Sequence, residues 1–325
     1  MPETFQRTLF DTYRTLRVAM VPLLLMLVVS TGLESTRGQD CLLGSISAYF
    51  HTPVRGAFVF SLAALGACLI AYKGNDAVEN VLLDFAGFMA WLVALVPTTV
   101  DDSCPGKYAG LVADANTADA VRNNVLSLVT VSVVFLVLYR LMPRQGRAAA
   151  TAAGGQRRTA RVLGTLCGAV VLAQLGMFVF WPSTFKDVAH GISASTMVLG
   201  VLGVMVANAV GFARAEQRTH GEGAGRPWRN RYGVTAAATL VILVATLAWL
   251  PWRSHLILAA ELVVVTGFGL FWLMQTHELC AFATRDQKTR AVVAQGQDAS
   301  APRPVEPPPV APDAVVAGRG ASVTP

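Results

Sequence analysis

Long apolar runs divide the chain, and short polar segments separate each run from the next. Each run approaches or exceeds the roughly 18 residues that a helix needs to cross a bilayer. The short alternating segments typical of an outer-membrane barrel are absent from the sequence. The pattern therefore predicts an all-α, polytopic transmembrane bundle. The expected eight spans are 18–33, 56–73, 81–99, 123–141, 162–181, 191–212, 233–251 and 256–276.

Basic residues gather in alternate polar segments, whereas the segment that holds Asp101, Asp102, Asp114 and Asp119 is acidic. Because Lys and Arg accumulate on the cytoplasmic side of a membrane, this alternation predicts that both termini are cytoplasmic. We expect a multi-pass protein of the cell membrane, with the lipid bilayer as its partner. The basic residues are Arg7, Arg14, Arg17, Arg140, Arg144, Arg147, Arg157, Arg158, Arg161, Arg214, Arg218, Arg226, Arg229 and Arg231.

The composition agrees with a membrane protein. Hydrophobic residues make up 54% of the chain and charged residues 14%, against about 25% charged residues in soluble domains. The net charge of +6 is spread over alternate segments and not over an aromatic-rich basic domain, so we expect no nucleic-acid partner. P-loop, Rossmann, nucleophile-elbow and haem-attachment motifs are absent from the sequence. The oligomeric state is not indicated.

Three regions follow from this pattern: a cytoplasmic N-terminus (1–17), a transmembrane domain (18–280) and a cytoplasmic tail (281–325). The tail contains "APRPVEPPPVAP", which cannot bury a core, so we expect the tail to be disordered. The first span follows a basic stretch, as the apolar part of a signal peptide does. No clear A-x-A site follows it, which favours an uncleaved anchor over a cleaved signal.

Two of the five cysteines, Cys41 and Cys104, fall in predicted outer segments, on the oxidising side of the membrane. A Cys41–Cys104 disulfide would join the first outer segment to the second. The alternative is two unrelated cysteines. No CxxC or zinc-ribbon spacing is present.

Several polar residues fall at one level, near the outer ends of the predicted spans. Glu261 lies one to two turns into the last span, where an acidic group is costly unless it finds a partner inside the bundle. Arg55 is the expected partner. The alternatives are a Glu261 that binds a ligand or metal, and a span shifted outward that leaves Glu261 in water. The candidates for an outward-facing pocket are Ser47, His51, Arg55, Asp187, His190, His255 and Glu261.

Three of these residues also suggest a zinc site. Asp187 and His190 are three residues apart and share a helix face, and a carboxylate and an imidazole can both bind zinc. His51 would add a second imidazole, with His255 or Asp101 as a further ligand. Zinc would lower the pKa of a bound water for attack on an amide or ester. Alternatively, Asp187 caps a helix and "SAYFH" (47–51) forms an interfacial turn or short helix before the second span.

Asp84 is the acidic residue expected inside the membrane near the inner side. Its expected partners are Lys73, across a short hairpin, and His277, at the end of the last span. A carboxylate near a helix start is also ordinary, because it faces the positive end of the helix dipole.

Five segments carry a resemblance: 44–74, 78–87, 121–125, 189–195 and 261–279. Together they resemble uncharacterised actinobacterial integral membrane proteins of similar length, which implies a shared helical fold and no established activity. A shorter pattern, Ser47-x-x-x-His51, resembles the serine–histidine motif of the CREST superfamily of ceramidases and adiponectin-receptor relatives. That resemblance implies a metal-dependent membrane hydrolase. The HxxxH pair of that group has no match here, since the region of His277 reads "THELCAF".

Three functions are therefore compatible with the sequence. The first is a membrane protein whose outward-facing pocket binds or moves a small polar molecule or a lipid headgroup. The second is a zinc-dependent hydrolase of amide or ester bonds that uses the same residues. The third is a structural or assembly protein that acts through its cytoplasmic tail. No convincing repeat relates 1–141 to 162–276, which counts mildly against transport.

Overall fold

The computed structural model describes residues 3–37, 42–99, 104, 117–141, 154–221, 225–249, 256–282 and 284–300. Within these ranges the chain is helical and contains no strand, as the sequence predicts. The helices are α1 (Glu3–Ser35), the 3₁₀-helix η1 (Ser47–His51), α2 (Arg55–Ala71), α3 (Ala77–Leu95), α5 (Thr117–Leu141), α6 (Gly154–Phe180), α7 (Pro182–His220), α8 (Arg231–Ala248), α9 (Leu256–Glu278) and α10 (Arg285–Ser300).

Seven helices in the described part of the chain are long and apolar enough to cross a membrane. They are α1, α3, α5, α6, α7, α8 and α9, and they make the chain a polytopic protein embedded in the lipid bilayer. The eighth expected span, α2, is apolar but shorter, from Arg55 to Ala71. At 1.5 Å per residue it is roughly 26 Å long, slightly less than the hydrocarbon core of a typical bilayer.

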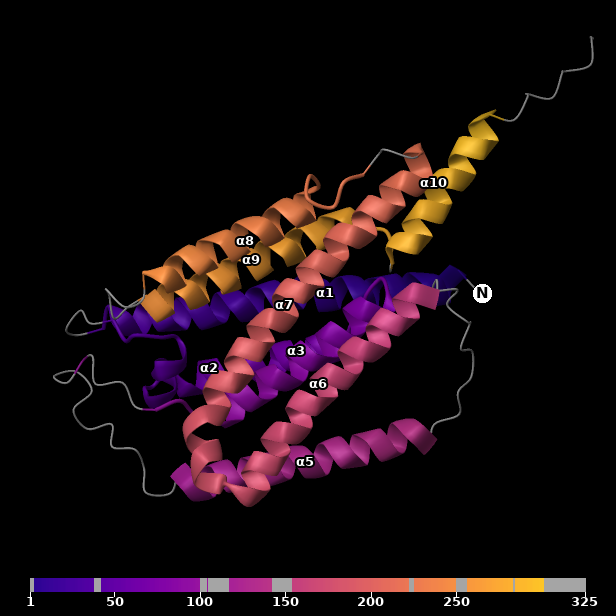
Figure 1. Cartoon of the computed structure of the whole chain (residues 1–325). Coiled ribbons are helices and arrows are strands. Elements are labelled where there is room, and N and C mark those ends of the chain that lie inside the picture. Colours follow the sequence, from indigo (N-terminus) through magenta and orange to yellow (C-terminus); the bar gives the residue numbers. More distant parts are fainter. Residues whose placement is uncertain are drawn as a thin grey trace, which may run out of the picture.

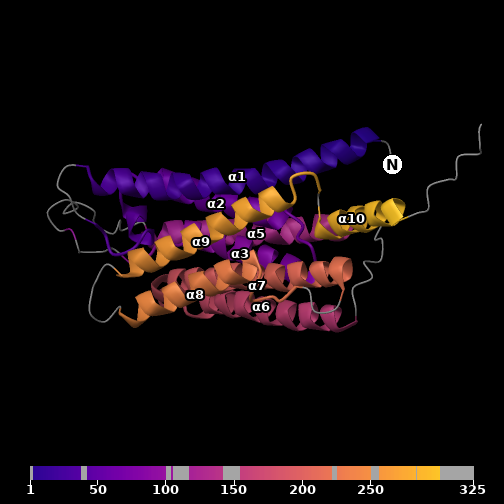
Figure 2. The ribbon, with the colours of Figure 1, turned by 90° about the horizontal axis from the view of Figure 1, so that it is seen from above.

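When α2 is included, successive helices from α1 to α9 run in opposite directions along the bundle (Figures 1 and 2). The N-terminus, the start of α8 and the end of α9 lie together at the end where α10 projects, which we call the α10 end. At the opposite end, which we call the η1 end, α1 finishes and α9 begins. Helix α1 begins and helix α9 finishes at the α10 end. That both termini lie on one side of the membrane stays a prediction, as does the side on which they lie.

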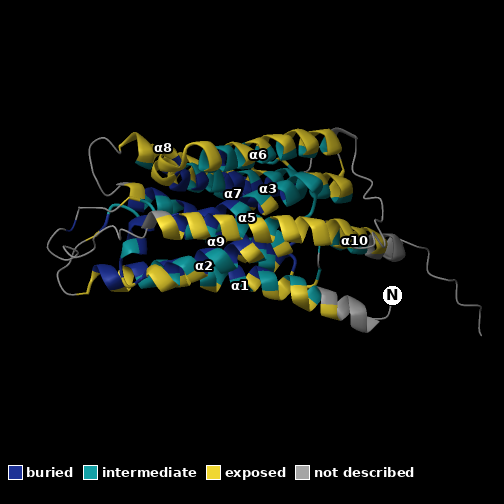
Figure 3. Cartoon of the chain, turned by 90° about the horizontal axis from the view of Figure 1, so that it is seen from below, coloured by how far each residue is buried: buried dark blue, intermediate teal, exposed yellow. Residues whose placement is uncertain are grey.

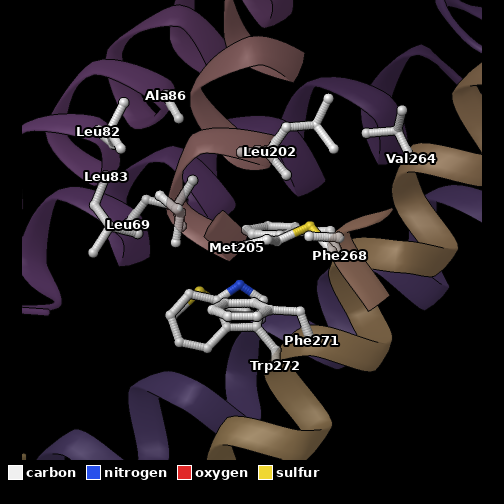
Figure 4. Packing of buried hydrophobic residues seen from close by; sticks show 14 of the residues in the cluster. Leu69, Leu82, Leu83, Ala86, Leu202, Met205, Val264, Phe268, Phe271 and Trp272 are labelled. Carbon is white, nitrogen blue, oxygen red and sulfur yellow. The ribbon is translucent and has the colours of Figure 1, made fainter. Parts of the chain in front are cut away.

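Helix α3 lies at the centre and packs against α2, α5, α6 and α7. Leu82, Leu83 and Ala86 of α3 belong to a core that also includes Leu202 and Trp272 (Figure 4). Helices α2 and α3 approach closely because glycines face each other. A Cβ on Gly66 would lie 2.6 Å from the Gly87 carbonyl oxygen, and one on Gly87 would lie 2.7 Å from that of Gly66. Small residues at such crossings permit close backbone packing in membrane helices.

The outer helices expose apolar side chains, as expected for surfaces that face lipid. Only 6% of the apolar window of α6 and 11% of that of α5 is buried in the bundle. Figure 3 shows the exposed residues in yellow along both helices. The hydrophobic side chains on the C-terminal half of α5, from Val131 to Leu141, are exposed.

Three helices, α1, α7 and α10, differ most from the sequence prediction. Helix α1 begins at Glu3, whereas the expected span begins at residue 18. Helix α7 runs from Pro182 to His220, well beyond the expected span 191–212. Hydropathy locates the part of a helix that contacts lipid, but polar turns at both ends continue the same helix. The expected disordered tail is wrong for residues 285–300, which form α10 and contact α7. Residues 301–325, including the proline-rich part, lie outside the described ranges.

Candidate functional site

At the η1 end, the partly buried carboxylate of Glu261 holds the segment before α2 against α9. It accepts hydrogen bonds from the backbone N–H of Ile46 and from the hydroxyl of Ser47, the latter at 3.3 Å. The backbone N–H of Leu258 donates to the Gly44 carbonyl at 2.7 Å. The residues Ser47–His51 form η1, which confirms the short helix that the sequence offered as an alternative to a catalytic motif.

The expected Glu261–Arg55 ion pair is wrong. Arg55 is exposed, and its guanidinium lies over the Phe50 ring, 4.6 Å from the centroid. The depth of Glu261 along its helix was the basis for the expected pair. The structure shows that η1 supplies a hydroxyl and an N–H to the carboxylate instead.

The two histidines at this end bond to the chain after α3. His51 Nε2 lies 2.8 Å from the Thr98 carbonyl oxygen, and His190 Nδ1 lies 2.6 Å from that of Val96. Because a carbonyl oxygen only accepts, each of these ring nitrogens carries a hydrogen. His51 and His190 therefore hold the chain where α3 ends, and the Nε2 of His190 is buried with no partner among the described residues.

The predicted zinc ligands His51, His190 and Asp187 do not come together. No group of three His, Cys, Asp or Glu residues in the described ranges is close enough to hold a metal. The reason is geometric, because Asp187 is exposed whereas His190 is buried against the end of α3. The further ligands considered from the sequence, His255 and Asp101, lie outside the described residues.

The bonding state of the described cysteines is consistent with part of the predicted Cys41–Cys104 disulfide. Cys104 is buried and disulfide-bonded, whereas Cys68, Cys167 and Cys280 are free. Cys41, the expected partner of Cys104, lies outside the described residues. The pairing of Cys41 with Cys104 therefore stays a prediction.

At the α10 end, a buried carboxylate accepts hydrogen bonds from N–H groups of two other helices and of the turn that precedes α3. Glu79 lies in the first turn of α3, a helix that the Asp76 side chain caps. Its carboxylate accepts from the backbone and side-chain N–H groups of Asn75, at 2.6 and 3.1 Å. It also accepts from Asn208 of α7 at 2.8 Å and from Gln275 of α9 at 3.4 Å. We call Glu79, Asn75, Asn208 and Gln275 the Glu79 cluster.

A third carboxylate, Glu278, pairs with a cation from beyond the last span. Arg285, the first residue of α10, donates to Glu278 through Nε at 2.9 Å and through Nη2 at 3.1 Å. Tyr232 donates its hydroxyl to the same carboxylate, and Arg231 Nη2 lies 3.4 Å from it. Burial disfavours the charged form of Arg285, but the hydrogen bonds and charge of Glu278 outweigh burial and raise its pKa above the usual value.

Arg285 also joins this pair to the Glu79 cluster. Its Nη2 lies 3.2 Å from the Asn208 side-chain oxygen, and its backbone N–H donates to Asn75 at 2.8 Å. Helices α3, α7, α8, α9 and α10 therefore meet in one buried polar network.

Beside this network, four buried residues carry polar atoms that have no hydrogen-bond partner in the described part of the chain. We call them the Arg17 site. Arg17 is 1% exposed, and its Nη2 donates to the Leu279 and Phe282 carbonyls at 3.1 and 3.0 Å. Its remaining donors have no partner. The atoms without partners are Arg17 Nε and Nη1, the Tyr72 hydroxyl, Trp272 Nε1 and Gln275 Oε1.

The residues of the Arg17 site are neighbours in the bundle. The Tyr72 and Trp272 rings meet edge to face with centroids 5.1 Å apart. Tyr72 also meets the ring of Tyr13, one helical turn before Arg17, with centroids 5.7 Å apart, and Gln275 bonds to Glu79. Because buried polar groups in proteins are nearly always hydrogen-bonded, such a concentration of free donors needs an explanation.

The sequence pattern did not single out Asn208, Gln275 or Glu278, and it did not predict that Arg17 is buried. Asp84, which it did single out, forms an ion pair with Lys73 at 3.3 Å, as one of the two alternatives predicts. Both side chains are about half exposed, at 52% and 50%, so the pair contributes little to stability. His277 is exposed.

Comparison with models of protein families, with curated proteins and with solved structures finds no match to this chain.

Proposed function

We propose that this membrane protein binds a small carboxylate molecule inside its helix bundle, at the Arg17 site. We further propose that α2 is an eighth span and that the α10 end is cytoplasmic. The clustering of basic helix ends at the α10 end supports this orientation. The predicted pocket at the η1 end has less support, because Glu261, His51 and His190 already bond to the protein there.

The observation that carries the proposal is the pair of free donors on Arg17. A guanidinium buried to 1% exposure, with no carboxylate in an ion pair with it among the described residues, is expensive unless an anion compensates it. Arginine is well suited to this role because its planar donors match carboxylate oxygens. Tyr72 and Trp272 add one hydroxyl and one N–H, which also lack a hydrogen-bond acceptor in the described protein.

The charge around the site favours a ligand with a single negative charge. Gln275 of the Arg17 site also bonds to Glu79, so the Glu79 carboxylate lies close to the site. Its negative charge would repel a multiply charged anion. The free Gln275 oxygen accepts hydrogen bonds, so it suits a ligand that also has a hydroxyl group. A small hydroxy acid such as lactate meets both requirements.

The test is the thermal stability of the purified protein in lipid nanodiscs, measured with lactate, acetate or chloride at equal ionic strength. A ligand that binds only the folded state raises the midpoint of unfolding as its concentration increases. We expect lactate to raise it in the wild type and in Arg14→Gln, which changes an exposed arginine one turn earlier in α1. Arg17→Gln should abolish the increase.

Tyr72→Phe is the second variant, because it removes a hydroxyl that has no partner in the described protein and so should not impair folding. It should weaken the response to lactate. A response to lactate that is unchanged in Arg17→Gln and Tyr72→Phe would contradict the proposal, as would the absence of any response to the carboxylates in the wild type.

A further inference from the structure

A second, separate feature of the α10 end is a basic groove at the surface. It has a volume of about 600 Å³ and lies between the end of α7, the turn before α8 and the first turns of α8 and α10. Four basic residues line it against a single carboxylate, that of Glu216. We call it the basic groove. Its lining residues are Phe212, Glu216, Gly225, Arg226, Arg229, Asn230, Arg231 and Lys288.

Two of the four cations in the basic groove are free to bind something else. Arg231 and Lys288 bond to Glu278, through its carboxylate at 3.4 Å and its backbone oxygen at 3.2 Å respectively. Arg226 and Arg229 are exposed, and neither forms an ion pair within the described part of the chain. The groove therefore keeps a positive charge that the protein does not neutralise.

The backbone that carries these two arginines is held in place. The buried Asn230 donates to the Ala209 carbonyl at 2.7 Å and accepts from the Gly233 N–H at 2.9 Å, which caps α8. Gly225 has a positive φ of 72°, and a Cβ there would lie 2.5 Å from the Ala213 carbonyl oxygen. The turn is thus packed tightly against α7, and the arginines project from a fixed support.

The groove lies where the apolar part of the bundle meets its polar end. It lies where the apolar span of α8 begins, at Arg231, and beside the polar last turns of α7. Trp228, in the same turn, is 64% exposed, and tryptophan is enriched at the boundary between membrane and water. Basic pockets at this level bind the phosphates of anionic lipid headgroups.

We propose that the basic groove binds the phosphate of an anionic phospholipid headgroup, with Arg226 and Arg229 as the principal ligands. Arginine donors bind phosphate oxygens in pairs. The start of α8 adds the positive end of its helix dipole to the same place. This site is independent of the Arg17 site, which lies inside the bundle.

The test measures lipid binding to the full-length protein purified in a neutral detergent, by native mass spectrometry. The probes are phosphatidylglycerol, phosphatidylcholine and the soluble compound glycerol 3-phosphate. Phosphatidylglycerol and phosphatidylcholine share a phosphodiester but differ in net charge. Glycerol 3-phosphate offers a phosphate without acyl chains, so it distinguishes a soluble ligand from a lipid.

The decisive variant is Arg226→Gln with Arg229→Gln. We expect the wild type to prefer phosphatidylglycerol over phosphatidylcholine, and the double variant to lose roughly tenfold or more in affinity for phosphatidylglycerol. The matched control is Arg161→Gln with Arg214→Gln, which removes the same charge from two exposed arginines outside the groove. The control should bind like the wild type.

Replacing both groove arginines by lysine keeps the charge but not the paired donors, so this variant should show an intermediate affinity. Equal losses in the groove variant and the control would reduce the effect to general charge and overturn the proposal. Equal affinity for the two lipids would overturn it as well. Binding of glycerol 3-phosphate without binding of phosphatidylglycerol would exclude the lipid as the source of the phosphate.

Discussion

Each end of the bundle holds a carboxylate that accepts several hydrogen bonds, but the surroundings of the two carboxylates differ. At the η1 end, Glu261 receives a backbone N–H and a hydroxyl from the segment that it holds in place. At the α10 end, Glu79 is bonded by the amides of Asn75, Asn208 and Gln275, and free donors remain beside it. The depth of an acidic residue in a span therefore says little about its role. The two carboxylates differ in the balance between donors and acceptors around them.

The largest effect should follow from breaking the buried ion pair at the α10 end. Glu278→Ala leaves the guanidinium of Arg285 buried without its carboxylate, and the loss of stability should be about 3–5 kcal/mol. The measurement is the free energy of unfolding in detergent. Asp84→Ala is the control, because it breaks the half-exposed pair with Lys73 and should change stability by less than about 1 kcal/mol. Similar losses in both variants would contradict the contrast between buried and exposed pairs.

A smaller effect is expected when the anchor at the η1 end is weakened. In Glu261→Gln, an NH₂ group replaces one of the two acceptor oxygens that receive the Ile46 N–H and the Ser47 hydroxyl. We expect a loss of about 1–3 kcal/mol and faster hydrogen exchange at Ile46 and its neighbours. Ser47→Ala should show the same local change more weakly. Exchange that rises uniformly over the whole bundle would argue against a local anchor.

The smallest effects separate two buried tyrosines at the α10 end. Tyr232 donates its hydroxyl to Glu278, whereas the hydroxyl of Tyr72 has no partner among the described residues. Tyr232→Phe should therefore reduce the free energy of unfolding by about 1–2 kcal/mol, whereas Tyr72→Phe should leave the ligand-free protein equally stable or slightly more stable. Unfolding of the two variants in the same detergent makes the comparison. A larger loss in Tyr72→Phe would mean that its hydroxyl bonds to the protein after all.

Hydropathy was sufficient to predict the helical bundle, because the need to shield the backbone from lipid leaves helices as the simplest solution. It also allowed the Lys73–Asp84 pair to be anticipated, since both residues flank one short hairpin. It did not give the rotation of each helix about its axis. The convergence of Glu79, Asn208 and Gln275 depends on that rotation, so it could not be predicted.

Two other errors have the same physical origin. Arg285 lies in a polar segment that looks disordered from its composition, but the buried Glu278 fixes it in the bundle. Glu261 and Arg55 lie at one level, yet η1 folds back to Glu261 and supplies its partners. Hydropathy does not predict the contacts that polar segments make when they fold back onto the bundle.

The position of Arg285 also has a consequence for biosynthesis. Every span described here precedes Arg285 in the chain, so all of them are synthesised before the cation that neutralises Glu278. A chain that stops between 279 and 284 would contain all of these helices but would bury a carboxylate that lacks its principal counter-ion. Prematurely terminated chains should therefore be less stable than the full chain although they contain all of these helices.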